Sequence, residues 1–452
     1  MPTASGSRDC WVARSWNNRR VASQVNPPRG MRDFLPADKA RRERVLGVIR
    51  HTFRAHGFDE IETPVVEDSA RLHAGLGGDN EKLAFGILKR GLTQEDFARA
   101  TDALDLADLG LRFDLTVPLA RFYASHRAEL PPVFRAIQMA PVWRAERPQK
   151  GRYRQFVQCD IDIIGEPGQL AEVELIVAAV DTLAALGLEG CTIRVGDRRL
   201  LTSMLEAFGF PAAVHAAVLI TLDKLDKIEA AGVVAELRSS PFAEEDGVPR
   251  AVDALEAFLT RPRTLEFVAY GERAIRRELP AGVDEAAVEH LVSLGDAVEA
   301  AGVDRRLLQF DPYLVRGMGY YTGTIFEVAH PDFGYSLAGG GRYDGMIGRF
   351  LGTEVPAVGF SLGFERLIDL VALRDGDDED QIALIYDIDV QPSQLARLKA
   401  ALVAGGSRVR LEKRTRNQRA QLDQLRAAGF GRFAFVTSAT TEASELELRS
   451  ID

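Results

Sequence analysis

The segment that most constrains the fold of this chain is residues 133–165, in which two alternating runs of apolar and polar residues flank a charged loop. Alternation with a period of two is typical of half-buried β-strands, and two such runs joined by a short polar loop predict an antiparallel hairpin. The stretch from Val142 to Asp162 reads VWRAERPQKGRYRQFVQCDID and covers the loop and the second strand. The loop sets one acid, Glu146, against a group of cations: Arg144, Arg147, Lys150, Arg152 and Arg154.

The two halves of this hairpin predict a substrate with two chemically different faces. Arg presents a planar fork that binds phosphate or carboxylate, so the loop suits a polyanion such as a nucleotide or a nucleic-acid end. Gln158, Asp160 and Asp162 recur at period two and therefore face the same side of the second strand. Like charges on one covered sheet face favour a cationic or amine ligand. The plainer alternative is a solvated basic loop beside a polar strand.

Two further stretches carry residues suited to binding. Asp114 and Thr116, in RFDLT, show the same i, i+2 spacing, and a carboxylate beside a hydroxyl can hold an ammonium group. LVRGMGYYTG places Arg316 next to Tyr320 and Tyr321, among glycines that permit close backbone approach. Each stretch also has a structural alternative, which for the aromatic pair is core packing with a cation reaching out to solvent.

Several common kinds of site are not supported by the sequence. GGGRYDG is neither a phosphate-binding P-loop nor a dinucleotide-binding fingerprint, and no HExxH spacing is present. The cysteines Cys10, Cys159 and Cys191 form no CxxC pair, which fits a reducing compartment and predicts no metal site. Arg366, which follows GFSLGFE at the start of an apolar helix, remains a candidate because nearby glycines let a flat group approach the strand.

Length and charge limit the class of protein. A chain of 452 residues is too long for one core and predicts two or three domains. No run approaches the ~20 apolar residues that cross a bilayer, and the start has no apolar signal region, so we expect a cytoplasmic protein without a membrane partner. The net charge of −10 argues against a nucleic-acid partner. Local field matters more than total charge, however, and the basic residues are clustered.

The domain organisation follows from changes in pattern along the chain. Residues 1–28 are predicted to be disordered, and residues 29–374 to form the main domain with a helical insertion at about 205–305. Apolar residues at helical spacing predict a helix ending at Gly57, followed by an edge strand broken at Pro64. Residues 111–123 are expected to be a strand ending at Pro118 and passing into a helix, and 313–330 to be strand-rich. Gly334–Asp344 is expected to be a turn, and 355–372 a strand running into a buried helix.

The C-terminal part is predicted to be a separate small α/β domain. Residues 375–381 form an acidic linker, and strands and helices alternate over residues 382–452. Cations outnumber acids strongly in its middle and predict a nucleic-acid footprint, although a solvated face is the alternative. These cations are Arg408, Arg410, Lys413, Arg414, Arg416, Arg419, Arg426 and Arg432.

Taken together, these segments resemble the histidyl-tRNA synthetase family, within the class II aminoacyl-tRNA synthetases. The resemblance is carried by RGMRDFLP, ETPVVE, RFDLTVPLAR, WRAERPQKGRYRQFVQCDIDIIG, LVRGMGYYTGTIFE, GGGRYDG and GFSLGFERL. It implies an α+β fold: an antiparallel-sheet catalytic core with a helical insertion and a C-terminal α/β anticodon-binding domain. One departure is RGMGYY, where the family usually has RGLDYY, so Gly319 replaces a carboxylate.

The resemblance also implies substrates and residue roles. The family activates L-histidine with ATP and Mg²⁺ and transfers it to the 3′ end of tRNA(His), as a homodimer. By position, Arg144 would hold the α-phosphate, Arg366 would lie against the adenine and γ-phosphate, and Arg316 would stabilise charge during attack. Arg147 and Gln149 would meet the tRNA acceptor end. Histidine binding would fall to Asp114, Thr116, Gln158, Asp162, Tyr320 and Tyr321.

The main alternative is a non-catalytic paralogue, the regulatory subunit of ATP phosphoribosyltransferase in histidine biosynthesis. That family resembles the synthetase core and binds histidine as an effector, but it typically lacks the C-terminal domain and the ATP-binding arginines. This chain retains Arg144, Arg316 and Arg366, together with a basic C-terminal segment. The sequence therefore favours the enzyme.

Overall fold

The computed structural model describes residues 25–73, 83–148, 151–261, 270–315, 320–371 and 381–451. Most of the segment predicted to be disordered, residues 1–24, lies outside these ranges, and so does the predicted acidic linker apart from Gln381. The domain boundaries drawn at these two segments stay predictions.

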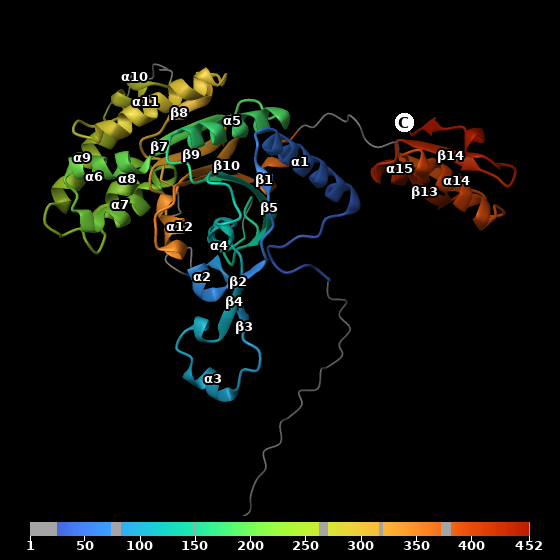
Figure 1. The fold of residues 1–452 in the computed structure, drawn as a ribbon, viewed down its shortest axis with the longest axis horizontal. Helices are drawn as coiled ribbons and strands as arrows, with labels where there is room; N and C mark the ends of the chain where they lie inside the picture. Colours follow the sequence, from blue (N-terminus) through green and yellow to red (C-terminus); the bar gives the residue numbers. More distant parts are fainter. Residues whose placement is uncertain are drawn as a thin grey trace, which may run out of the picture.

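An eight-stranded mixed sheet forms the centre of the fold, in the strand order β1-β5-β6-β11-β10-β9-β7-β8 (Figure 1). The six middle strands pair antiparallel with their neighbours, whereas the short edge strands β1 and β8 pair parallel. The strands are β1 (Asp59–Glu60), β5 (Phe134–Trp143), β6 (Gln155–Ile164), β7 (Thr192–Asp197), β8 (Leu308–Phe310), β9 (Thr324–His330), β10 (Phe333–Arg342) and β11 (Ala357–Gly363).

The predicted hairpin is confirmed as β5 and β6. They pair antiparallel from Phe134 opposite Ile164 to Trp143 opposite Gln155. Ile161 belongs to the main apolar core on one face of the sheet, and its neighbours in sequence point to the other face. The alternation in the sequence therefore places one side of β6 in the core and leaves the other side for the polar residues.

Helices cover both faces of this sheet (Figure 1). The predicted stripe on the first helix is confirmed, because Val45, Ile49 and Phe53 of α1 are fully buried. They pack with α5 and α11 on one face, while α4 and α12 cover the other. Gly57, with φ of 81°, follows the end of α1 as predicted. The helices are α1 (Pro36–Ala55), α4 (Thr116–His126), α5 (Leu170–Ala185), α11 (Glu285–Ala300), α12 (Asp344–Leu351) and the short α13 (Phe364–Leu367).

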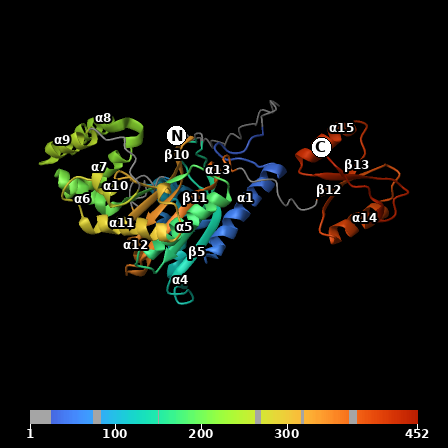
Figure 2. The ribbon, with the colours of Figure 1, turned by 90° about the horizontal axis from the view of Figure 1, so that it is seen from above.

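The predicted helical region begins at α6 and contains two groups of helices. Those from α6 to α9 share an apolar core of their own, whereas α10 and α11 pack into the main core beside α5. Figure 2 shows α6 to α9 grouped at one end of the sheet. Their bounds are α6 (Arg198–Phe208), α7 (His215–Leu222), α8 (Leu225–Arg238), α9 (Val248–Leu259) and α10 (Glu272–Arg277).

Two smaller sheets complete the described structure. The first, in the order β2-β4-β3, projects from the main body with α2 and α3 (Figure 1). Its elements are β2 (Val66–Asp68), β3 (Phe85–Leu88), β4 (Ala107–Leu111), α2 (Ser69–His73) and α3 (Gln94–Arg99). The C-terminal unit is an α/β sheet in the order β13-β12-β14-β15. It contains β12 (Gln381–Tyr386), α14 (Pro392–Ala404), β13 (Arg408–Lys413), α15 (Gln418–Ala427), β14 (Arg432–Val436) and β15 (Arg449–Ser450).

The turn predicted over Gly334–Asp344 is wrong, because most of this stretch forms β10 in the middle of the main sheet. A Cβ at Gly340 would lie 1.9 Å from the carbonyl oxygen of Gly359 on the neighbouring strand. The glycines therefore allow two strands to approach closely. A sequence does not distinguish this use of glycine from its use in turns.

The strand predicted to run from residue 111 to Pro118 is also wrong, whereas the helix predicted to follow it is confirmed as α4. Strand β4 ends at Leu111 and α4 begins at Thr116, which places Pro118 in the first helical turn. A proline is tolerated there because the first backbone N–H groups of a helix have no intrahelical partner. Strand β9 covers the last part of residues 313–330, which were predicted to be strand-rich, and residues 316–319 lie outside the described ranges. Within the ranges that the structure describes, every helix is too short or too polar to cross a membrane.

Candidate active site

A cavity of about 930 Å³ lies over the middle strands of the main sheet. Arg147 is exposed and does not line it, while Arg316 and Gln149 lie outside the described residues. The other residues to which the family resemblance assigns substrate binding all line this one cavity: Asp114, Thr116, Arg144, Gln158, Asp162, Tyr320, Tyr321 and Arg366.

The floor of the cavity is the polar face of β6. Gln158 and Asp162 are both buried and face the same side, as predicted from their spacing. The register with β11 places Gly359 opposite Asp162, and a Cβ on that glycine would lie 2.0 Å from the carboxylate. A glycine on the neighbouring strand is therefore what leaves room for the carboxylate.

Asp162 is held by a tyrosine from the start of α12. The hydroxyl of Tyr343 donates to its Oδ1 at 2.6 Å. Burial raises the pKa of Asp162 to about 7, and the hydrogen bond from Tyr343 opposes that rise. The carboxylate is thus fixed in direction and can change its protonation state near neutral pH.

A second carboxylate enters from the start of α4. Asp114 Oδ1 accepts from the backbone N–H of Val117 at 3.2 Å, so the acid sits at the helix N-terminus rather than on a strand. Burial raises the pKa of Asp114 to about 6. Thr116, the first residue of α4, is hydrogen-bonded to the Tyr320 hydroxyl. Asp114 and Thr116, which their spacing predicts to lie on one face of a strand, lie instead at the N-terminus of α4.

Two buried acceptors in this cavity have no hydrogen-bond partner among the residues that the structure describes. They are Asp114 Oδ2 and Gln158 Oε1. An unpaired buried polar atom costs about 1–3 kcal/mol, so such atoms are usually explained by a ligand or water. Both are acceptors, and the ligand that would satisfy them is a donor such as an ammonium group.

Asp160 is a third carboxylate on the same face of β6. It accepts from Gln158 Nε2 at 3.2 Å and lies opposite Ser361 on β11. Burial raises its pKa well above the ordinary value, and the neighbouring Asp162 raises it further. The sequence pattern placed Asp160 on this face but gave it no role.

Two arginines line the same cavity. Arg144 follows the last residue of β5, and its Nε donates to the carbonyl of Phe113 at 3.0 Å. Arg366 belongs to the four-residue helix α13, where its Nη1 donates to the carbonyl of Ser336 and its guanidinium lies 5.1 Å from the ring centre of Tyr335. Burial lowers the pKa of Arg144 from its ordinary value, and Asp114 opposes that shift. Arginines fixed in this way are preorganised for an anion.

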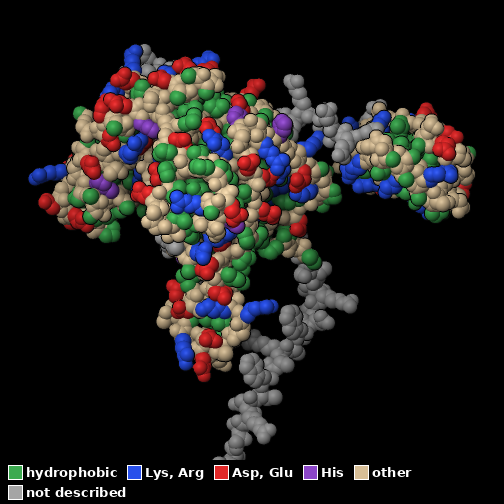
Figure 3. All heavy atoms as spheres, in the orientation of Figure 1, with side chains coloured by type: hydrophobic (Ala, Val, Ile, Leu, Met, Phe, Trp, Pro, Cys, Tyr) green, Lys and Arg blue, Asp and Glu red, His purple; other side chains and the backbone are tan. Residues whose placement is uncertain are grey.

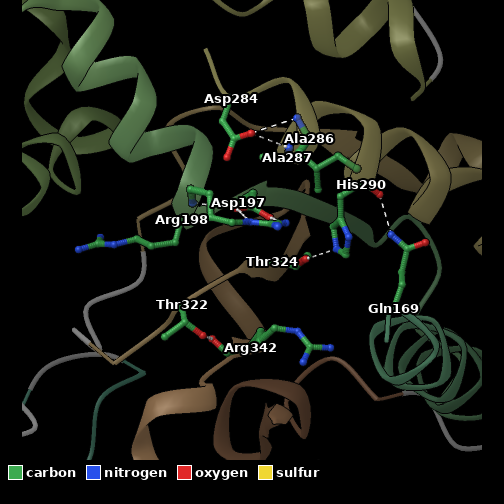
Figure 4. A network of polar contacts seen from close by, with 12 residues as sticks. Gln169, Asp197, Arg198, Asp284, Ala286, Ala287, His290, Thr322, Thr324 and Arg342 are labelled. Carbon is green, nitrogen blue, oxygen red and sulfur yellow. Dashed lines mark hydrogen bonds and ion pairs between the residues drawn. The ribbon is translucent and has the colours of Figure 1, made fainter. Parts of the chain in front are cut away.

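A hydrogen bond joins Thr322 to Arg342 beside the site (Figure 4). Thr322, directly after Tyr321, donates its backbone N–H to the carbonyl of Arg342 at 2.8 Å. The Arg342 guanidinium makes two bonds of 2.7 Å to the fully buried Glu172 of α5. This ion pair fixes the end of β10, and hence Tyr343, against the helix layer.

Two contributors to the site were missed from the sequence, Tyr343 and Ser361. Tyr343 belongs to GGGRYDG, and the glycines of this stretch predict a turn in which the tyrosine has no binding role. Ser361 carried a usable signal, because VGFSLG alternates apolar residues with Gly359, Ser361 and Gly363, the period of a strand with one open face. Those three residues lie opposite Asp162, Asp160 and Gln158 in the sheet.

The arrangement can bind a small molecule that carries an ammonium or imidazole next to a polyanion. Three carboxylates, one of them with an oxygen that lacks a partner among the described residues, line the cavity together with Gln158 and two oriented guanidinium groups. The described residues contain no group of three or more His, Cys, Asp or Glu side chains arranged to hold a metal ion.

Comparison with known proteins agrees with this chemistry. The family model of histidyl-tRNA synthetase matches residues 30–367. The chain is 60% identical to the histidine–tRNA ligase of Leifsonia xyli subsp. xyli, an alignment that covers 95% of this chain and 99% of that protein. It is 37% identical to the histidine–tRNA ligase of Aeropyrum pernix, over 95% and 94% of the two chains.

Solved structures share the fold. The histidyl-tRNA synthetase of a Nostoc species has a TM-score of 0.72 at 25% identity and covers 94% of this chain and 95% of its own. A Bacillus halodurans chain described as an ATP phosphoribosyltransferase regulatory subunit/histidyl-tRNA synthetase has the same TM-score at 20% identity, a likeness of fold alone. It covers 92% of this chain and 99% of its own. The predicted α+β class II core is confirmed, and the chain belongs to the histidyl-tRNA synthetase family.

Proposed function

We propose that this chain is a ligase that activates L-histidine with ATP and transfers it to the 3′ end of tRNA(His). The observation that carries the proposal is one cavity lined both by buried carboxylates and by fixed arginines. We assign Asp114 and Asp162 to an acidic end that holds the amino acid, and Arg144 and Arg366 to a cationic end that holds the nucleotide. In this assignment the two substrates lie side by side in one cavity.

The amino acid occupies the acidic end in this proposal. Its ammonium group donates to Asp114 Oδ2 and Gln158 Oε1, the two buried acceptors without a partner among the described residues. The imidazole packs against Tyr320 and Tyr321, which are in contact with each other at 4.9 Å between ring centres, and donates an N–H to Asp162. Thr116 supports this pocket by its hydrogen bond to Tyr320.

ATP occupies the cationic end and enters as its magnesium complex. The histidine carboxylate attacks the α-phosphorus, the bond to the bridging oxygen breaks, and pyrophosphate leaves with the electron pair. Arg144 binds the α-phosphate and Arg366 the adenine and γ-phosphate. Fixed cations next to developing phosphoryl charge lower the barrier because they need no reorganisation. The family resemblance assigns Arg316 to the same charge.

The second step joins the amino acid to the tRNA. The terminal ribose hydroxyl attacks the carbonyl carbon of the adenylate, and AMP leaves. We assign the approach of the acceptor end to Arg147 and Gln149, and recognition of the anticodon to the basic C-terminal unit. We also propose a homodimer, as the family resemblance implies, and a cytoplasmic location, as expected of an enzyme that charges tRNA for translation.

The regulatory-subunit alternative is less well supported. Its effector role needs only the residues that we assign to histidine, yet Arg144 and Arg366 also line the cavity. The C-terminal α/β unit that such paralogues typically lack is also present. The relatives from Leifsonia xyli and Aeropyrum pernix are both named histidine–tRNA ligases.

Histidine-dependent ATP–pyrophosphate exchange, followed by charging of tRNA(His), tests the proposal. We expect exchange with L-histidine and none without it, and charging only with tRNA(His). Arg316→Ala should abolish exchange while leaving histidine binding largely intact. Purified protein that binds histidine but gives no exchange would support the regulatory alternative and contradict the ligase.

A further inference from the structure

The segment that precedes α1 touches the nucleotide end of the cavity from outside. Residues 29–35 do not line the cavity, but the carbonyl of Gly30 accepts from the backbone N–H of Arg154 at 2.8 Å. The carbonyl of Arg154 in turn accepts from the backbone N–H of Arg144 at 2.9 Å. Gly30 has φ of 85°, and a Cβ there would lie 2.7 Å from Pro148, so the contact with the basic loop is close.

Arg32 extends this contact to both the loop and the helix that carries Arg366. Its guanidinium stacks 3.5 Å from the ring centre of Tyr153, which lines the cavity. The same guanidinium forms an ion pair with Glu365, whose side chain is only 4% exposed. One side chain therefore bridges a wall of the cavity and α13.

Glu365 is the centre of a cluster that joins three segments of the chain. Both of its oxygens accept from Arg42 of α1, at 2.7 and 2.6 Å. Its Oε1 also accepts from the backbone N–H of Val157 at 3.3 Å, next to the binding face of β6. Figure 2 shows α13 beside α1, as these bonds require. The carboxylate is thus held by the N-terminal segment, by α1 and by the hairpin.

The direction of Arg366 depends on this cluster. Helix α13 has four residues, and a single helical turn is not stable by itself. Glu365 immediately precedes Arg366, so anchoring one fixes the backbone of the other. The Arg366 Nε lies 3.4 Å from the carbonyl of Gly151, at the far side of the loop that Arg32 also contacts.

We propose that residues 29–34 form a strap that positions the nucleotide-binding groups, with Arg32 as its positioning residue. The strap acts through Glu365 on Arg366, and through Tyr153 and Gly30 on the loop that follows Arg144. The histidine end is anchored by other bonds, those of Tyr343, Val117 and the start of α4. Loss of Arg32 should therefore weaken ATP binding and leave histidine binding unchanged. The inference rests on the proposed function for its kinetic readout.

Arg32→Ala tests the strap while leaving Glu365 paired with Arg42. We expect the KM for ATP in the exchange reaction to rise about tenfold, the loss of one charge-assisted hydrogen bond. Histidine affinity measured calorimetrically without ATP should not change. Arg32→Lys should recover part of the effect, since Lys restores the charge but does not stack flat on Tyr153. Lys39→Ala is the matched control, because its ion pair with Glu43 is exposed on α1.

The outcomes separate this inference from the proposed function. It is overturned if Arg32→Ala and Lys39→Ala give equal KM values for ATP. It is also overturned if the KM values for ATP and histidine rise together with a lowered unfolding temperature. If the wild type gives no exchange, the proposed function fails and calorimetric ATP affinity decides the strap: a weaker affinity for Arg32→Ala than for Lys39→Ala supports it, and an equal one contradicts it.

Discussion

Each carboxylate of the histidine end is buried, and burial gives these residues properties that an exposed acid lacks. Asp162 is 5% exposed and held by Tyr343, and Asp114 is 2% exposed and held by one backbone N–H. Charged groups in such surroundings are costly in the empty protein but bind a cation strongly, because little water competes. Burial of these carboxylates therefore lowers the stability of the empty protein and raises its affinity for a cationic ligand.

Asp162→Asn tests this effect of burial. The pKa of Asp162 is raised to about 7 in the folded protein, above the value near 4 of an exposed Asp, so the folded state holds the proton more tightly. This contribution to stability is present below pH ~4 and lost as the pH rises through 7. The amide should therefore raise the free energy of unfolding at pH 8 by on the order of 1–3 kcal/mol. Urea unfolding at several pH values measures it.

The gain from Asp162→Asn should shrink as the pH is lowered toward 4, and exchange activity should be lost. Asp108→Asn, an exposed position on β4, is the control and should change neither. A gain that is constant between pH 8 and pH 4.5 would contradict the assignment of the effect to a buried charge.

Arg144→Gln tests the cationic end. Glutamine keeps a donor near Phe113 but removes the charge, so we expect kcat of exchange to fall on the order of 10²–10³-fold, as for loss of a preorganised group in acyl transfer. The KM for histidine should change little. Steady-state exchange measures both values, with Arg50→Gln, from a surface ion pair with Glu60, as the control. A change confined to the KM for histidine would rule out the assigned role.

At the scale of elements, the glycines of β10 and β11 let the middle strands come together. Gly340→Ala should lower the free energy of unfolding by about 3 kcal/mol or more, because the new methyl group meets backbone that has little room to move. Gly345→Ala in α12 is the matched control, since its Cβ would meet nothing within 4 Å. Thermal unfolding of both variants measures the difference, and equal midpoints would refute the close-packing explanation.

The sequence predicts those elements whose residues follow one simple period. Alternation identified β5 and β6, helical spacing identified α1, and the binding face of β6 followed directly from Gln158 and Asp162. Prediction failed where one residue type serves two purposes. Glycine marks both turns and strands in close contact, and Pro118 ends a strand or starts a helix with equal ease.

The parts of the site that stayed hidden depend on long-range pairing. Nothing local indicates that Ser361 lies opposite Asp160, or that Tyr343 reaches Asp162 across the sheet; both follow from the register of β6, β10 and β11. Arg32 and Glu365 are separated by more than 300 positions, and only the folded chain joins them. Local patterns thus give the strands and their faces, while the tertiary structure gives the partners.

At the scale of the whole molecule, the C-terminal unit carries its own cores and its own charge. Two apolar clusters flank its sheet, and neither shares residues with the main core. Figure 3 shows Lys and Arg side chains gathered on the side of this unit nearer the rest of the chain. Lys413, Arg416 and Arg419 are exposed along the connection from β13 to α15. This surface suits a phosphate backbone.

The double substitution Lys413→Ala and Arg416→Ala should raise the KM for tRNA(His) and leave pyrophosphate exchange unchanged. Each lost phosphate contact should also reduce the slope of log affinity against log salt by about one. Arg449→Ala, on β15 at the opposite edge of the same sheet, is the control. Charging assays at several salt concentrations measure the effect, and parallel losses in exchange and charging would contradict a separate role for this unit.

The glycine positions of the cavity wall have a consequence for inhibition. Side chains at Gly340, Gly359 and Gly363 would meet backbone or the Asp162 carboxylate at 1.9, 2.0 and 3.0 Å. An inhibitor could gain its affinity by lying flat on the main chain at these glycines. A substitution at any of these positions would disrupt the protein itself. Resistance to such a compound should therefore arise at the rim of the cavity, where side chains can change, and only rarely beneath the compound.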